Sequence, residues 1–111
     1  MQDLNLVRKT TKTLKVTFTN KNTGEPINIT GYTLYFTVKK TPSQSDSLAN
    51  IFKTVTTHTN PTEGETQILL TPEDTDIPQG NYIYDLCYIT SSNNRYSTVP
   101  KTFIVMGKVK D

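Results

Sequence analysis

The sequence lacks most of the residues on which catalytic sites depend. Its 111 residues include one cysteine, one histidine and no tryptophan. The single cysteine, Cys87, cannot form an internal disulfide. As a nucleophile it would need a nearby base, and the chain offers only His58 as a histidine. We therefore expect Cys87 to be a small buried hydrophobe that is unreactive in the native fold.

Recognised metal-binding and phosphate-binding motifs are missing as well. His58 has no second histidine or cysteine at zinc-ligand spacing. The acidic cluster of Glu73, Asp74 and Asp76 does not match a calcium loop, so these side chains are expected to bond local backbone N–H groups. A Gly-rich phosphate loop, a Gly-x-Ser-x-Gly elbow and an HExxH motif are all absent. The sequence predicts no catalytic residue, no metal site and no cofactor.

Charge and hydropathy argue against two classes of partner. The 12 basic and 10 acidic residues give a formal net charge of +2. This charge is too small and too dispersed to indicate a nucleic-acid or anionic-membrane partner. The longest clean apolar run, residues 103–106, is far shorter than a membrane span. Residues 1–5 have no apolar segment of the kind that a secretory signal contains, so no such signal is expected.

Threonine, in contrast, is abundant, at 21 of the 111 residues. Threonine is β-branched and suits strands, and its hydroxyl keeps an outward face hydrated. Residues 81–89 are apolar or aromatic at nearly every position. A strand sends alternate side chains to opposite faces, and here both faces have something to bury. The segment is therefore predicted to be a central strand.

Alternation of apolar and polar residues predicts further strands, at residues 3–6, 12–19, 32–40, 51–59, 66–71 and 95–105. Pro100 places the last of these at a sheet edge or a bulge. Residues 41–50 are polar and read as a loop, and residues 72–80 as a corner or short helical turn. The residues predicted to be mostly buried are Leu14, Val16, Phe18, Leu34, Phe36, Val38, Ile68, Leu70, Tyr82, Tyr84 and Leu86.

The number and spacing of the strands indicate the fold class. Seven to eight short strands, with turn signals every 8–12 residues or so, are typical of a two-layer antiparallel β-sandwich. The chain length is usual for one domain. We therefore expect a single all-β domain over residues 1–111, with its core at about residues 12–106 and short extensions at both ends.

Four segments together resemble a known family. They are residues 29–39 (ITGYTLYFTVK), residues 55–61 (VTTHTNP) with Gly64, residues 70–75 (LTPEDT) and residues 80–86 (GNYIYDL). In this order they resemble small immunoglobulin-like domains of tailed bacteriophages. That family includes the N-terminal domain of the phage baseplate upper protein and standalone small proteins encoded among virion genes. The resemblance covers about residues 12–106.

The resemblance implies an immunoglobulin-like two-sheet sandwich. Tyr82 follows a glycine corner, much like the tyrosine corner of such sandwiches. Tyr84 stands where an antibody domain would carry its second cysteine, so the core would be held by packing alone.

The resemblance also implies a function. It points to a non-enzymatic structural protein of the virion, either a tail or baseplate component or a capsid-decorating protein, made in the bacterial host cytoplasm. Its partners would be other virion structural proteins, and it would be a homo-oligomer or present in many copies on a symmetric assembly. Leu4, Leu6, Tyr35 and Val109 are the residues expected to contact a partner. Leu4 and Leu6 would do so from a terminal arm; alternatively, they complete the domain's own edge strand.

Two other functions stay open at this point. A carbohydrate- or receptor-binding module is the first alternative, although such modules usually show several exposed aromatic residues and mainly Tyr35 is expected outside. An enzyme is the second. Glu63 and Glu65 flank Gly64 as two carboxylates in a turn, but nothing in the sequence would raise the pKa of one over the other, as a glycosidase requires.

Overall fold

A computed structural model describes residues 3–41, 45–98 and 100–107. Within these residues the chain forms eight strands and two short 3₁₀ helices, and no α-helix. The predicted all-β class is confirmed. The elements are β1 (Leu4–Val7), β2 (Lys12–Thr17), β3 (Thr33–Lys39), η1 (Asp46–Leu48), β4 (Ile51–Val55), η2 (Pro61–Glu63), β5 (Glu65–Leu70), β6 (Gly80–Ile89), β7 (Arg95–Ser97) and β8 (Lys101–Met106).

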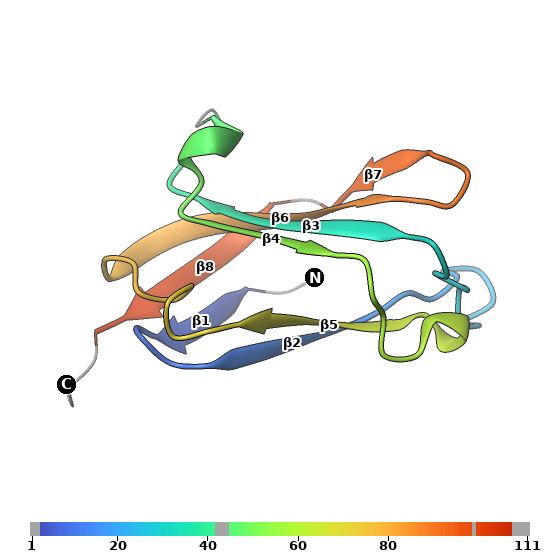
Figure 1. Ribbon diagram of the computed structural model, residues 1–111, viewed down its shortest axis with the longest axis horizontal. Coiled ribbons are helices and arrows are strands. Elements are labelled where there is room, and N and C mark those ends of the chain that lie inside the picture. Colours follow the sequence, from blue (N-terminus) through green and yellow to red (C-terminus); the bar gives the residue numbers. More distant parts are fainter. Residues whose placement is uncertain (1–2, 42–44, 99, 108–111) are drawn as a thin grey trace.

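The strands form a large curled sheet and a small one. The large sheet has the order β1-β8-β6-β3-β4, with β7 also paired to β6, and the small sheet consists of β2 and β5. Figure 1 shows the β2–β5 pair lying beneath the large sheet. β1 runs parallel to β8, whereas the other strand pairs are antiparallel. The prediction of a central strand at residues 81–89 is confirmed, because β6 pairs with β3, β7 and β8.

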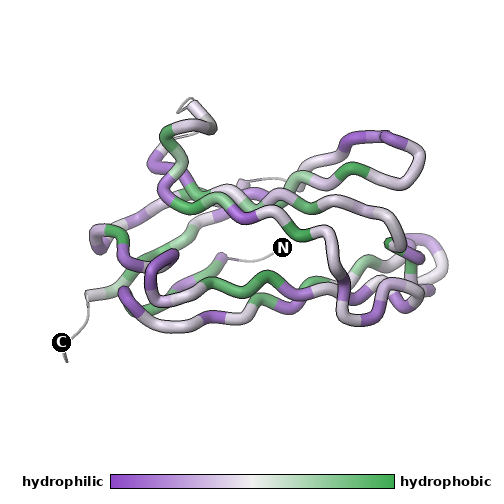
Figure 2. The backbone as a smooth tube through the Cα atoms, viewed as in Figure 1, coloured by the Kyte–Doolittle hydropathy of each residue, from purple (hydrophilic) through white to green (hydrophobic). Residues whose placement is uncertain are grey.

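The core lies between the two sheets and follows the predicted alternation. Of the residues predicted to be buried, Phe18 alone is only partly buried, and it packs against the core from its edge. Phe103 and Val105 on β8 and Ile51 on β4 add to the core. Figure 2 shows hydrophobic stretches along the strands of both sheets and hydrophilic residues at most of the turns. Burial of one face of each sheet is therefore what joins the two layers.

The predicted last strand, residues 95–105, is wrong in one respect: it is two strands. β7 and β8 pair with successive parts of β6, and the chain leaves the ladder between them. At the break, the N–H of Thr98 donates to the Leu86 carbonyl at 3.0 Å, and the Thr98 hydroxyl accepts from the Leu86 N–H at 3.0 Å. Pro100 follows, where the absence of an N–H costs no ladder bond.

The corner before β6 is held by two side chains. The Tyr82 hydroxyl donates to the Pro78 carbonyl at 2.6 Å. One carboxylate oxygen of Asp74 accepts from the Thr71 N–H at 2.9 Å, the Thr71 hydroxyl at 3.0 Å and the Lys53 ammonium at 3.0 Å. The prediction that the acidic cluster bonds the local backbone is thus confirmed for Asp74.

These contacts make the corner sensitive to acid. Burial raises the pKa of the Asp74 carboxyl, but hydrogen bonds from Thr71 and Lys53 outweigh it, so that the pKa lies below its ordinary value of 3.8. The charged carboxylate therefore stabilises the fold above the ordinary value, and this contribution is lost as pH falls through the lowered folded-state pKa. We expect Asp74→Asn to be less stable than wild type at neutral pH and to lose less stability on acidification.

Urea unfolding from neutral to strongly acidic pH measures this effect. Glu73→Gln is the matched control, because Glu73 is an exposed neighbour in the same turn. The control should follow the wild-type profile. An Asp74→Asn profile parallel to that of wild type at every pH would show that Asp74 is not the group responsible.

Candidate functional site

The face of the large sheet that points away from β2 and β5, here termed the outer face, carries the candidate site. Four residues of β6 that alternate with its core residues have side chains on this outer face and are only partly buried. They are Ile83, Asp85, Cys87 and Ile89. The prediction that both faces of β6 are buried is therefore wrong for this side. The cause is the position of the second sheet, since β2 and β5 pack only against the inner face. Figure 1 shows η1 and β7 rising at opposite ends of the outer face.

A depression of about 460 Å³, here termed the outer hollow, opens on this face. β3, β4 and β6 supply most of its lining, and the segment between β6 and β8 supplies the rest. Its lining residues are Tyr35, Thr37, Lys39, Phe52, Ile83, Tyr84, Asp85, Cys87, Arg95 and Pro100. The volume lies within the range of small-ligand sites, about 300–1,000 Å³.

Two aromatic rings on neighbouring strands form the apolar part of the outer hollow. The Tyr35 and Phe52 ring centroids are 6.0 Å apart, with an angle of 33° between the ring planes. Tyr35 points outward as predicted and stands opposite Thr54 on β4. Phe52 is 49% exposed. Sequence reasoning missed Phe52, although its parity, opposite to that of the core residue Ile51, already placed it on the outer face.

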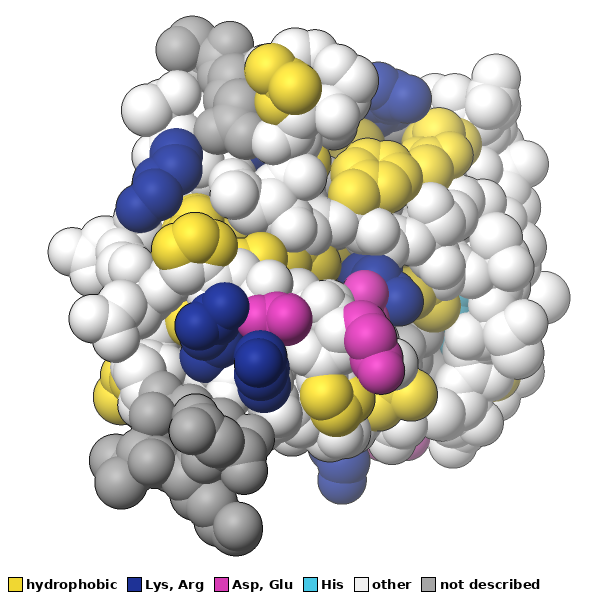
Figure 3. All heavy atoms as spheres, turned by 60° about the vertical axis from the view of Figure 1, so that its left-hand side comes forward, with side chains coloured by type: hydrophobic (Ala, Val, Ile, Leu, Met, Phe, Trp, Pro, Cys, Tyr) yellow, Lys and Arg dark blue, Asp and Glu magenta, His cyan; other side chains and the backbone are white. Residues whose placement is uncertain are grey.

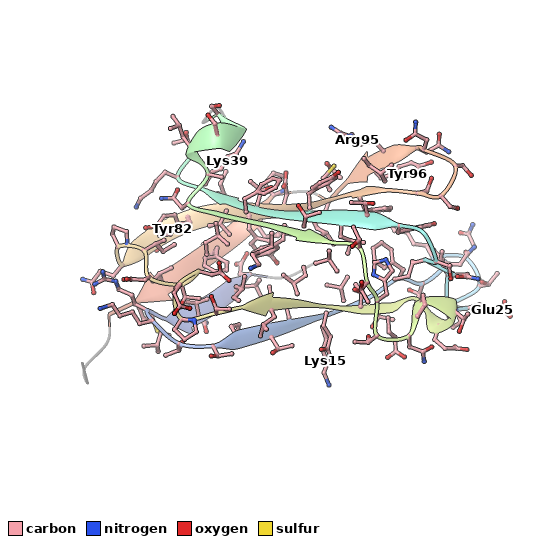
Figure 4. The ribbon with its side chains drawn as sticks, in the orientation of Figure 1. Lys15, Glu25, Lys39, Tyr82, Arg95 and Tyr96 are labelled. Atoms are coloured by element: carbon pink, nitrogen blue, oxygen red, sulfur yellow. The ribbon has the colours of Figure 1, made fainter. Side chains whose placement is uncertain are left out.

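Three charged side chains line the outer hollow: a basic one at each end, Lys39 and Arg95, and an acidic one between the two ends, Asp85. Lys39 lies opposite Ile83 in the ladder and Arg95 lies opposite Ile89. These positions on β6 are six residues apart, which corresponds to about 20 Å along a strand. Figure 4 shows Lys39 and Arg95 at opposite ends of the outer face. Asp85 lies between them on β6, so the hollow offers hydrogen-bond donors at its ends and an acceptor near its middle.

Cys87 lines the outer hollow, which corrects the expectation that this residue is buried. The side chain is partly exposed, beside Tyr35 in the ladder. We expect a small alkylating reagent such as iodoacetamide to modify Cys87 in the native protein without denaturant. Mass spectrometry over time measures the rate, and the urea-unfolded chain gives the upper limit. Modification only at the rate of global unfolding would show that the thiol is covered.

A second apolar surface lies on the outer side of β1 and β8. Val7, Ile104 and Met106, here termed the outer strip, are exposed hydrophobic residues. Val7 and Met106 are direct neighbours in the parallel β1–β8 ladder. Figure 3 shows exposed hydrophobic side chains in several separate patches, with basic and acidic side chains adjoining one another between them.

The structure places Leu4 and Leu6 away from the outer hollow. Leu6 is buried in the core and Leu4 packs against it, because β1 pairs with β8 along its length. Within the described residues Leu4 and Leu6 thus complete the domain's own edge strand, which is the alternative to a terminal arm. Val109 lies outside the described residues. Of the three predicted contacts within the described residues, only Tyr35 lines the outer hollow.

The single histidine links the two sheets. Nε2 of His58 lies 2.8 Å from the carbonyl oxygen of Tyr32, and Nδ1 lies 2.9 Å from the hydroxyl of Thr66. Because a carbonyl only accepts, Nε2 carries the proton in this bond, and Nδ1 accepts from Thr66 in the neutral ring. Thr66 is buried, so His58 satisfies a polar group inside the fold.

Two other kinds of site are absent from the described residues. Residues 3–41, 45–98 and 100–107 contain no group of three or more His, Cys, Asp or Glu side chains that could hold a metal ion. No helix in the same ranges is long and apolar enough to cross a membrane.

Neither the protein-family models nor the curated proteins include a match to this chain.

Proposed function

We propose that this protein is a non-enzymatic structural component of a tailed-bacteriophage virion. It would be a tail or baseplate component or a capsid-decorating protein, and would act by docking onto repeated copies of another virion protein. The four segments that resemble phage immunoglobulin-like domains support this proposal. A fold analogy alone does not assign a function. The docking role is therefore also inferred from the exposed residues of the protein.

The finer fold assignment, an immunoglobulin-like sandwich, has two supports. First, β8, β6, β3 and β4 follow one another as strands G, F, C and C′ do in a variable-type domain, and β2 pairs with β5 as B pairs with E. Second, Tyr82 near the start of β6 donates to the Pro78 carbonyl four residues upstream, which is the geometry of a tyrosine corner.

The outer strip is the observation that carries the docking role. A sheet face in contact with water is expected to be polar, whereas Val7, Ile104 and Met106 are apolar and exposed together on the outer side of β1 and β8. Contiguous exposed apolar residues mark contact surfaces. A rigid sheet edge of this kind suits a repeated, symmetric partner, because the same small contact is then used many times.

Two experiments test this role. Gradient-purified particles of the phage that encodes the chain should contain it in many copies by quantitative mass spectrometry. Particles lacking the chain should then bind added purified protein. We expect Ile104→Glu to abolish this attachment, because it places a charge in the apolar contact. Leu69→Glu is the matched control, since Leu69 is an exposed apolar residue on the small sheet.

Circular dichroism and thermal unfolding would establish that both variants fold. Absence of the chain from purified particles would overturn the virion assignment. Attachment of the folded Ile104→Glu variant with wild-type affinity would overturn the outer strip as the docking surface.

A further inference from the structure

We propose that the outer hollow is a binding site for an oligosaccharide. This goes beyond the docking role, which rests on the outer strip, and does not depend on it. The proposal rests on three features of the outer hollow: an aromatic platform, polar groups at fitting positions, and a floor without unused backbone groups.

The aromatic platform matches the apolar side of a sugar ring. Tyr35 and Phe52 are adjacent rings, with centroids 6.0 Å apart, and both line a hollow of about 460 Å³. The face of an aromatic ring is electron-rich and attracts polarised C–H groups, while its area is large and rigid. Because a pyranose presents several C–H groups on one side, it can pack on such a platform and keep its hydroxyls free for polar contacts.

The polar groups around the platform suit hydroxyls. Thr37 offers a hydroxyl, Asp85 a carboxylate acceptor, and Lys39 and Arg95 offer donors. A sugar hydroxyl both donates and accepts, so it can pair with either kind. Because the ladder positions of Lys39 and Arg95 are about 20 Å apart along β6, the hollow fits a chain of several sugar units better than a single ring.

The floor disfavours an extended peptide. β3 and β6 are interior strands of the sheet, and their backbone groups are already used in the ladder. A peptide laid across their side chains would desolvate its own N–H and C=O groups without backbone partners. A nucleic acid fits poorly too, because the carboxylate of Asp85 lies between the two cations where a phosphate chain would pass.

A matched pair of aromatic variants tests the site. Phe52 in the outer hollow is 49% exposed, and Tyr96 is 51% exposed. Figure 4 shows Tyr96 on β7, near Arg95. The Tyr96 ring lies on the other side of β7 from the outer hollow, and its centroid is 5.6 Å from that of Tyr88. The wild-type protein is screened on an array of defined neutral and acidic oligosaccharides, and the best binder is titrated by calorimetry. We expect Phe52→Ala to weaken binding by about tenfold or more, and Tyr96→Ala to leave it unchanged.

Cys87 gives a second readout that does not depend on affinity. The thiol lines the outer hollow, so the bound oligosaccharide should slow its alkylation in wild type and in Tyr96→Ala, but not in Phe52→Ala. The folded Ile104→Glu variant should keep both binding and protection, which separates this site from the docking surface.

Three outcomes would overturn the proposal. The first is a wild-type protein that binds no oligosaccharide on the array. The second is a loss of binding in Tyr96→Ala as large as that in Phe52→Ala. The third is a bound oligosaccharide that leaves the alkylation rate of Cys87 unchanged.

Discussion

Gly64→Ala should destabilise the protein by about 4 kcal/mol, a loss at the upper end for single substitutions. Gly64 ends η2 in the left-handed region, with φ of 73°, which costs a residue with a side chain about 1–2 kcal/mol. An added Cβ would also lie 2.5 Å from the Phe18 carbonyl oxygen and 2.7 Å from that of Ile27.

The surrounding backbone has little freedom to relieve this overlap. The Phe18 N–H donates to the Gly64 carbonyl at 2.8 Å, and the Ile27 N–H donates to the Phe18 carbonyl at 3.0 Å. Three chain segments are thus bonded to one another around the point where the Cβ would enter. Moving any of them would break one of these backbone hydrogen bonds.

Gly24→Ala is the matched control for this prediction. Gly24 has the same φ of 73°, but a Cβ there would meet nothing within 4 Å. The control should therefore lose only the conformational contribution, about 1–2 kcal/mol. Urea unfolding of both variants measures the difference. Equal losses would mean that the backbone at Phe18 and Ile27 moves aside freely.

Phe36→Ala should destabilise the protein by about 3–5 kcal/mol. Phe36 is fully buried at the centre of the core, with ring centroids 5.5 Å from Tyr84 and 6.2 Å from Phe103. Truncation removes its own burial and leaves these two rings facing a cavity, and both effects lower the free energy of unfolding.

Phe52→Ala provides the comparison, because it removes the same atoms from the outer face of a neighbouring strand. With 49% of Phe52 exposed, its loss should cost about 1 kcal/mol. Equilibrium unfolding in urea, with the slope checked for two-state behaviour, measures both variants. Similar losses for Phe36→Ala and Phe52→Ala would contradict the assignment of inner and outer faces.

Local alternation predicted the core well, because a strand's parity is a property of neighbouring residues. Leu34, Phe36 and Val38 on β3 are all buried as expected. Ile29 is also fully buried, yet it lies outside any strand, held by a bond from its N–H to the Pro61 carbonyl at 2.9 Å. Periodicity carries no information about such a residue, since its burial depends on a contact with a distant turn.

The candidate site was predictable only in part. The alternation of side chains along a strand places Tyr35 and Phe36 on opposite faces of the sheet. It does not say which of these faces a second layer will cover. Which face is covered depends on how the strands divide between the two sheets, and this division is a property of the whole chain. The assumption that both faces of β6 are covered therefore failed, and with it the expected burial of Cys87. Phe52, in contrast, could have been predicted, because its parity is opposite to that of the core residue Ile51.

The parallel pairing of β1 with β8 has a mechanical consequence. Tension applied at residues 3 and 107 pulls these strands in opposite directions along their lengths. The register pairs from Leu4 and Phe103 to Val7 and Met106 then share the load in shear and must rupture together, instead of opening one at a time as in a peeled hairpin. A force-extension measurement with handles at these positions should show a single high rupture peak, whereas gradual yielding would count against load sharing. We therefore expect the domain to resist tension applied between residues 3 and 107.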